Sequence, residues 1–179
     1  MAVSSTLDAI DRRILQSLQE NARLSSAELA QKVGLSASPV WRRVRALEEA
    51  GVITGYQALV DPAAVGLAVN VFVHVSLEKQ VETALEAFEA AVRRRPEVLE
   101  CYLMTGESDY LLRVVVPDLA EYERFLMDHL TRIRGIASIK SSFALRPVKH
   151  GSGIPLPDRP AGDAKPTRRP ARPRRVGGA

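Results

Sequence analysis

The stretch LSSAELAQKVGLSASPVWRRVRALEEAGVITGY, residues 24–56, is typical of two short helices joined by a tight turn. Ser25 or Ser26 can cap the first helix, because a hydroxyl there can accept a hydrogen bond from the free backbone N–H groups. Gly34 can adopt the left-handed conformation that lets the chain turn sharply, and Ser36 is expected to cap a second helix. The pattern predicts a helix-turn-helix, whose usual partner is DNA.

The second helix of this motif separates into an apolar and a basic face when its residues are projected at 100° per residue. Val40, Val44 and Leu47 form the apolar stripe, which we expect to be buried. Arg42 and Arg45 lie roughly opposite, where an arginine can bind a guanine edge through two parallel hydrogen bonds. The candidate DNA-binding residues are Ser36, Ser38, Trp41, Arg42, Arg43 and Arg45.

Arg43 differs from the other arginines because it projects near the edge of the buried stripe. We expect it to reach a phosphate or a carboxylate of the preceding helix, such as Asp11, and not a base. The alternative for the whole basic face is that its arginines only solvate a surface helix. The caps, the turn glycine, the apolar stripe and the basic face all agree, which favours DNA binding.

The composition is that of a globular protein of 179 residues, long enough for one large or two small domains. No apolar run reaches the ~18 residues that a membrane span needs, and no signal-peptide pattern is seen, so we expect a cytoplasmic protein. Cys101 is the only cysteine, which excludes an intrachain disulfide and a cysteine-based metal cage. We expect Cys101 to be buried in a strand.

The formal net charge of +4 is unevenly distributed along the chain. Residues 150–179 contain seven Lys and Arg against two Asp and Glu, whereas residues 1–149 contain 18 against 19. Positive charge for binding DNA must therefore come from the second helix of the motif and from this tail.

The N-terminal part predicts one small domain. Residues 7–21 form an amphipathic helix that would pack across the two-helix motif and complete a three-helix core. The stretch VITGYQALVD (52–61) predicts a strand pair, or wing. We therefore expect a winged helix-turn-helix domain at residues 1–62 and a linker at 63–68.

Residues 69–150 show the order strand, helix, strand, strand, helix, strand. This order predicts an α+β domain of the ferredoxin-like (βαββαβ) class, in which helices cover only one face of the sheet. The other face would carry Phe72, His74 and Tyr102, so we expect two copies to dimerise through it. His74 could instead be a metal ligand or an acid–base group, but no second His, Cys or acidic residue stands at ligand spacing.

Residues 151–179 are rich in Pro, Gly, Arg and Ala and predict a disordered tail, apart from an IPLP segment (154–157) that can dock onto the folded part. The run RRPARPRR (168–175) can bind nucleic-acid phosphates without sequence preference. The alternative is a solubilising tail with no further role.

Taken in order, these segments resemble the leucine-responsive/asparagine regulator (Lrp/AsnC) family of transcription regulators. The resemblance covers residues from about 5 to 150. It is carried by LDAIDRRILQSLQENAR (7–23), LSASPVWRRVRALEEAGVI (35–53), PEVLECYLMTGESDYLLRVVVPD (96–118) and SSFALRPVK (141–149). It implies that the second domain senses small molecules, usually amino acids, in clefts where subunits meet.

In that family the loop between the second and third strands of the sensing domain forms part of the cleft. In the matching loop, Gly106 lets backbone approach a ligand, and Asp109 can pair with an α-ammonium group. The alternative is an ordinary hairpin turn with a glycine and an acidic tip. The candidate effector-binding residues are Gly106, Glu107, Ser108, Asp109 and Tyr110, with Ser142 on the last strand.

We therefore expect a sequence-specific, DNA-binding transcription regulator of amino-acid metabolism. A small effector would alter its assembly or its DNA affinity, with a branched-chain amino acid as first candidate because the loop resembles that of regulators of branched-chain catabolism. We expect homodimers that assemble further, to octamers, and no cofactor or metal. The alternative is a nucleoid-associated architectural protein with little sequence preference. An enzyme is disfavoured because no nucleophile–base pair, phosphate loop or metal cluster is evident.

Overall fold

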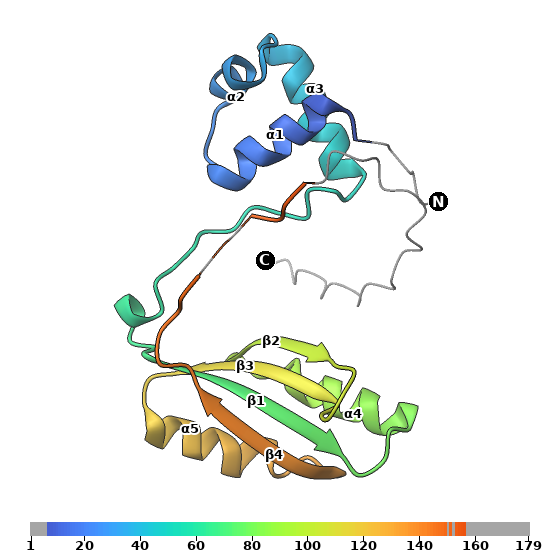
Figure 1. Cartoon of the computed structure of the whole chain (residues 1–179), viewed down its shortest axis with the longest axis vertical. Helices are drawn as coiled ribbons and strands as arrows, with labels where there is room; N and C mark the ends of the chain where they lie inside the picture. The colour runs from blue at the N-terminus through green and yellow to red at the C-terminus, as the bar shows by residue number, and fades with distance from the viewer. Residues whose placement is uncertain (1–6, 150, 152, 157–179) are drawn as a thin grey trace, which may run out of the picture. The chain divides into compact units, whose positions relative to one another are not determined.

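The structure is a computed structural model that describes residues 7–149, 151 and 153–156. The described residues form two compact units (Figure 1), one from residues 7–57 together with 151 and 153–156, the other from residues 58–149. In the first unit the side-chain amide of Gln19 binds the backbone of Ile154 twice, which partly confirms the docking expected for the IPLP segment. The disorder predicted for residues 157–179 lies outside the described residues.

The first unit contains three helices, α1 (Ala9–Glu20), α2 (Ser26–Val33) and α3 (Ala37–Glu49). Asp8 caps α1 and Ser25 caps α2, and each forms a reciprocal pair of hydrogen bonds with the third residue of its helix. The predicted cap at Ser25 is thus confirmed. Ser36 occupies the same position before α3, but its side chain makes no cap hydrogen bond.

The core of the first unit is built where the apolar stripes of the three helices meet. Gly34 ends α2 in the left-handed conformation, with φ 74°, and turns the chain into α3. The buried residues are Ile14, Leu15, Leu29, Ala30, Val33, Val40 and Leu47. The predicted apolar face of α3 is therefore the buried one, although Val44 is only partly buried.

Residues 52–61 do not form the strand pair predicted for them. The backbone N–H groups of Val52 and Ile53 both donate to the carbonyl of Leu47, so this segment begins as a helix C-terminal turn. Beyond Ile53 every residue to Asp61 is exposed. An isolated two-stranded ribbon that packs against no other element is only marginally stable in water. This explains why the strand-like sequence here does not form a β-ribbon.

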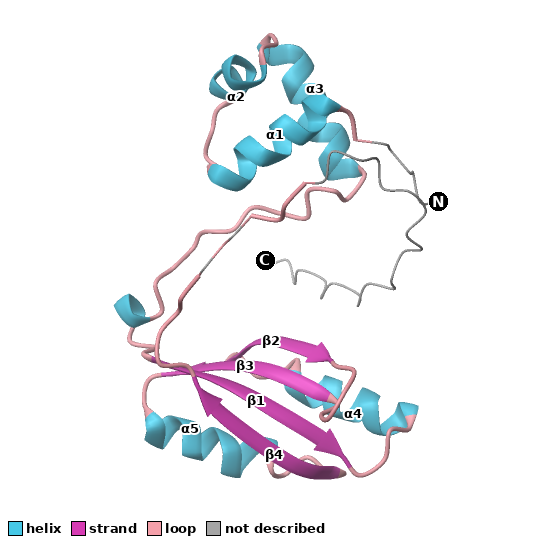
Figure 2. Cartoon of the chain, viewed as in Figure 1, coloured by secondary structure: helices cyan, strands magenta, loops and turns pink. Residues whose placement is uncertain are grey.

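The second unit is a four-stranded antiparallel sheet with helices on one face (Figure 2). After a short 3₁₀ turn (Ala63–Val65) its elements are β1 (Val69–Leu77), α4 (Glu82–Val92), β2 (Val98–Leu103), β3 (Tyr110–Val116), α5 (Leu119–Phe125), a π-helical turn η2 (Leu126–Leu130) and β4 (Ile136–Phe143). The strand order is β2-β3-β1-β4, which confirms the ferredoxin-like prediction.

The alternation predicted for β1 sorts its residues onto the two faces of the sheet. Val71, Val73 and Val75 are fully buried and pack against Phe88 of α4 and the other core residues. Phe72 and His74 point to the opposite face, which no helix of the described residues covers. Cys101 lies in a strand as predicted, on β2, but the burial predicted for it was wrong, since this residue is exposed.

Replacing Gly34 tests the turn that positions α3. Gly34→Ala is expected to destabilise the protein by about 1 kcal/mol, since an L residue is strained at this positive φ although a Cβ would meet no atom within 4 Å. Gly34→Asn is the matched control and should cost less, because asparagine tolerates the left-handed region. Urea unfolding measures both, and equal stabilities of the two variants would contradict the assignment to backbone strain.

Candidate nucleic-acid interface and effector loop

The exposed side of α3 carries an aromatic and cationic surface. Trp41 is 54% exposed, and the Arg45 guanidinium lies over its ring, 5.2 Å from the centroid. Arg42 is exposed and forms no ion pair with any described residue. Ser36 and Ser38 are exposed at the start of the helix. This arrangement suits contact with a polyanion, because the charges are accessible and one of them is held by an aromatic ring.

Arg43 has a different role within the unit. Its Nη1 atom lies 2.7 Å from Asp8 Oδ2 and 2.8 Å from Asp11 Oδ1, so one guanidinium joins α3 to the beginning of α1. Of the two expectations for Arg43, a phosphate or a carboxylate, the free protein shows the carboxylate. Its place among the DNA-binding candidates stays a prediction, but its donors are already engaged.

The contacts between the beginning of α1 and α3 shift the pKa values of Asp8 and Arg43. The backbone hydrogen bond from Asp11 holds the pKa of Asp8 below its ordinary value, and the Arg43 guanidinium lowers it further, although partial burial acts in the opposite direction. The Asp11 and Asp8 carboxylates in turn raise the pKa of Arg43. Asp8 and Arg43 therefore stay charged across the neutral range.

The loop between β2 and β3 is longer than a tight hairpin and is held by the carboxylate of Asp109. Asp109 Oδ2 accepts from the backbone N–H of Leu77 at 2.7 Å, and Oδ1 accepts from Gln80 Nε2 at 2.6 Å. The N–H of Met104 donates to the carbonyl of Asp109 across the base of the loop. In the free protein both oxygens of Asp109 thus accept hydrogen bonds from the chain itself. The observed role of this residue is therefore to fix the shape of the loop, and not to offer a free carboxylate to a ligand.

The tip of the loop is open. Gly106 has φ 130°, and a Cβ built there would meet no atom within 4 Å. Glu107 is exposed, and Ser108 is half-buried. The backbone at Gly106 and the side chain of Glu107 are therefore accessible to a ligand.

Tyr110 and Ser142 do not join this tip within the chain. Tyr110 is buried under α4, where its ring packs on Phe88 and its hydroxyl lies 3.3 Å from Glu89 Oε1. Ser142 pairs with Phe72, four residues along β1 from Ser76, which corresponds to about 13 Å. The predicted set is therefore not one cluster in a single chain.

Two residues on the open face of β1 contact the loop and were not predicted to do so. His74 Nδ1 lies 3.1 Å from Ser108 Oγ, and Ser76 Oγ donates to the carbonyl of Glu107 at 3.4 Å. His74 therefore contacts a side chain of the loop, a serine and not one of the metal-ligating residue types. The only sequence signal for this contact is that alternation places His74 and Ser76 on one face.

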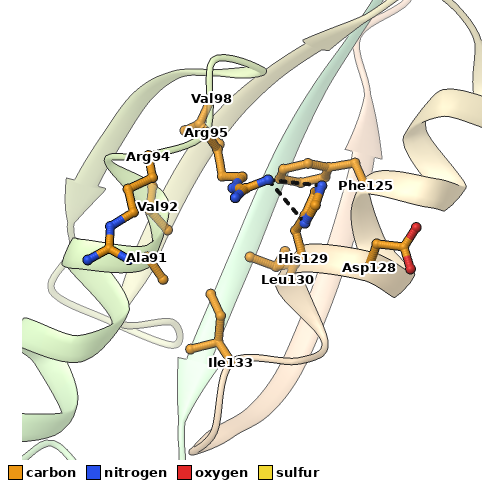
Figure 3. Close-up of a pocket in the computed structure, with 10 residues that line it drawn as sticks. All are labelled: Ala91, Val92, Arg94, Arg95, Val98, Phe125, Asp128, His129, Leu130 and Ile133. Atoms are coloured by element: carbon orange, nitrogen blue, oxygen red, sulfur yellow. Dashed lines mark hydrogen bonds between the residues drawn. The ribbon is translucent and has the colours of Figure 1, made fainter.

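A cavity of about 210 Å³ lies between the end of α4 and the π-helical turn (Figure 3). Arg95 Nη1 lies 3.0 Å from Nε2 and 3.1 Å from Nδ1 of His129 at its edge. Sequence reasoning missed this site because the two residues are 34 positions apart. An adjoining cavity of about 490 Å³ is lined in part by Glu97, whose Oε2 is buried without a partner among the described residues.

Within the described ranges, no three His, Cys, Asp or Glu side chains gather as a metal ion would need. No helix of those ranges has the length and apolar character that crossing a membrane demands.

Comparison with known proteins agrees with this geometry. Residues 7–54 match a family model described as winged helix-turn-helix DNA-binding, and residues 70–154 match the Lrp/AsnC ligand binding domain. The Bkd operon transcriptional regulator of Pseudomonas aeruginosa is 52% identical over 150 residues, which cover 84% of this chain and 98% of that protein. The proline dehydrogenase transcriptional activator of Rhodobacter capsulatus is 46% identical over 146 residues, or 82% of this chain and 95% of that protein.

The solved structures include a transcriptional regulator from Neisseria meningitidis in complex with L-Met. It superposes with a TM-score of 0.81 at 44% identity and covers 84% of this chain and 97% of that one.

The charge on Asp8 can be tested separately from its capping role, because asparagine caps a helix about as well. Asp8→Asn is expected to lower the free energy of unfolding at pH 7 by about 0.5–1 kcal/mol, the range for a partly exposed ion pair. The folded-state pKa of Asp8 lies below the unfolded value near 3.8. The difference should therefore be present above about pH 4 and vanish as the pH falls through the folded pKa. Urea unfolding between pH 7 and pH 3 measures it, and a difference that does not change with pH would sink this account.

Proposed function

The chain belongs to the Lrp/AsnC family of DNA-binding transcription regulators, and we propose that it reads its operator with α3 and responds to an amino acid held at the Met104–Asp109 loop. The proposal that α3 reads the operator rests on the different environments of the arginines on this helix. Arg42 and Arg45 are accessible, whereas Arg43 is bound by Asp8 and Asp11.

In the proposed complex, Arg42 binds a base edge in the major groove. Its guanidinium has no ion pair with a described residue, so it does not have to give up a favourable contact within the protein when it binds DNA. Arg45 is held over Trp41 and is suited to a phosphate or a second base, because the ring restricts its rotamers. Ser36 and Ser38, at the N-terminus of α3, add hydroxyl donors to the backbone of the duplex.

We place dimerisation on the sheet face that carries Phe72 and Tyr102, which are 36% and 52% exposed. Their neighbours on this face include Arg113 and Glu100, which pair with each other at 3.0 Å, so each would enter an interface with an ion-pair partner. A dimer would present two α3 helices, so the operator is an imperfect palindrome. We extend this proposal to the assembly of such dimers into octamers. Since the protein acts on the chromosome, we place it in the cytoplasm.

The effector half rests on the open tip at Gly106 and on the contacts beneath it. Backbone N–H groups of the tip can bind a carboxylate, and Glu107 is free to face an α-ammonium group. The Neisseria regulator was solved with L-Met, which favours an amino acid, and a branched-chain side chain is our first candidate. Because Ser142 lies away from the tip, a second subunit would have to complete the cleft.

His74 and Ser76 offer a route from the loop to assembly. Both bind the loop and both lie on the proposed dimer face. A ligand that moves Ser108 or Glu107 therefore acts on the residues that meet the partner. An effector changes DNA binding only if it prefers one assembly state, and the two affinities then change each other by the same factor.

The operator can be found by selection from random duplexes and then used to test Arg42. Arg42→Ala is expected to weaken operator binding by about ten- to a hundredfold while random duplex is bound almost as before, because one bidentate base contact is lost. Arg134→Ala, an exposed arginine of the other unit, is the matched control. A wild-type preference for the operator below about a thousandfold would favour the architectural alternative instead.

His74→Ala tests the coupling. We expect the factor by which the effector changes operator affinity to fall at least about fivefold, with operator affinity in the absence of effector retained. Lys140→Ala is the control, because Lys140 faces His74 across the β1–β4 register and does not bind the loop. Calorimetry with each of the twenty amino acids, with and without operator, measures this coupling factor for both variants. If the coupling survives the loss of His74, the route through this residue does not exist.

A further inference from the structure

The carboxyl group of Glu97, just before β2, has one oxygen without a partner at the wall of a cavity. Its Oε2 atom is buried and forms no hydrogen bond with any described residue. The backbone holds this residue beside β3, because its carbonyl accepts from the N–H of Val115 at 2.9 Å. A buried acceptor without a donor destabilises a protein, and native structures keep few of them. A donor supplied from outside the chain would account for this one.

The other charged groups that line this cavity already have partners. They pair as Glu121 with Arg124, Asp128 with Arg132, and His129 with Arg95. Figure 3 shows the last of these contacts, in which the guanidinium lies against the imidazole ring. Among the described residues, Glu97 is therefore the acidic group of this lining that no cation of the chain neutralises.

The rest of the lining is apolar. It consists of Leu67, Pro96, Val115, Val116, Pro117 and Phe125. Val115, Val116 and Phe125 are buried, so they form a firm wall. The volume of about 490 Å³ falls within the range of about 300–1,000 Å³ that is usual for small-molecule sites. Such sites combine an apolar wall with a small number of polar groups that orient the ligand, as Glu97 would do here.

We propose that this space, the Glu97 cavity, binds a small molecule that carries an ammonium group on an aliphatic body. The ammonium group donates to Oε2 of Glu97 in a charge-assisted hydrogen bond, and the body covers Val115 and Phe125. A metal ion is a poorer fit, because within the described ranges no three His, Cys, Asp or Glu side chains gather.

The site is independent of the effector proposed for the loop. Its lining includes no residue of the Met104–Asp109 loop, and every residue that lines it belongs to one chain. The inference therefore stands or falls separately from the proposed function.

An ammonium group on an aliphatic body occurs both in alkylamines and in amino acids, and three probes distinguish these sources. Isoamylamine and L-leucine share the branched body and the ammonium group, whereas isocaproate has the body and a carboxylate but no ammonium group. The proposal requires isoamylamine to bind and isocaproate not to bind. Tighter binding of L-leucine than of isoamylamine identifies the ligand as an amino acid, and weaker binding identifies it as an amine.

Binding is measured on the full chain by methyl NMR. Isoamylamine is expected to shift the methyl signals of Val115 and Val116 in a saturable way, with a dissociation constant below about 1 mM, which is attainable for a ligand of this size. The methyl group of Met104 reports separately on the loop. Absence of saturable shifts at Val115 and Val116, or equal shifts with isocaproate, would overturn the proposal without any variant.

Glu97→Gln keeps the shape of the side chain and removes its charge. We expect it to bind isoamylamine at least about tenfold more weakly, because a charge-assisted hydrogen bond becomes a neutral one. Glu123→Gln is the matched control, since Glu123 is an exposed carboxylate of α5 that lines neither cavity. Its affinity should equal that of the wild type. Equal affinity of Glu97→Gln and wild type would show that Oε2 does not hold the ammonium group.

Discussion

Burial of one stripe of α3 against α1 and α2 is the constraint on which the function of this chain depends. Val40 and Leu47 have almost no exposed surface, so the rotation of α3 about its own axis is determined by the core. That rotation decides which arginines are free. Arg42 and Arg45 are turned outward, while Arg43 is placed against Asp8 and Asp11 at the beginning of α1. The same carboxylates cap α1, so helix formation, packing and the selection of base-reading side chains share one set of contacts.

The sensing unit depends on a different asymmetry, because its helices cover only one face of the sheet. β1 is central and contributes valines to the covered face and Phe72, His74 and Ser76 to the open one. The loop before β3 is tied to this strand by Asp109, Ser108 and Glu107. In the proposed mechanism, ligand and partner subunit therefore act on neighbouring residues of a single strand, and no long pathway through the core is needed.

Electrostatics divides the molecule in a way that the net charge of +4 conceals. The helical unit is almost neutral because its carboxylates balance its arginines, and this balance suits specific reading, in which geometry decides more than field strength. Residues 157–179, with seven Lys and Arg against two Asp and Glu, carry the excess positive charge.

The sequence by itself determined the elements and their order. Periodicity of 3.6 and of 2, capping residues and Gly34 predicted the helix-turn-helix, the order of elements in the ferredoxin-like sheet and the buried stripe of α3, because these features arise from neighbours a few residues apart. The carboxylate expected as one partner of Arg43 lies 32 positions away, and it could be expected only because the stripe sets the rotation of α3. Tertiary structure alone decided which contacts joined distant segments. It placed residues 52–61 outside any strand, buried Tyr110, separated Ser142 from the loop and linked Gln19 with Ile154. Pairing over such separations depends on packing and on chain entropy, which no local pattern records.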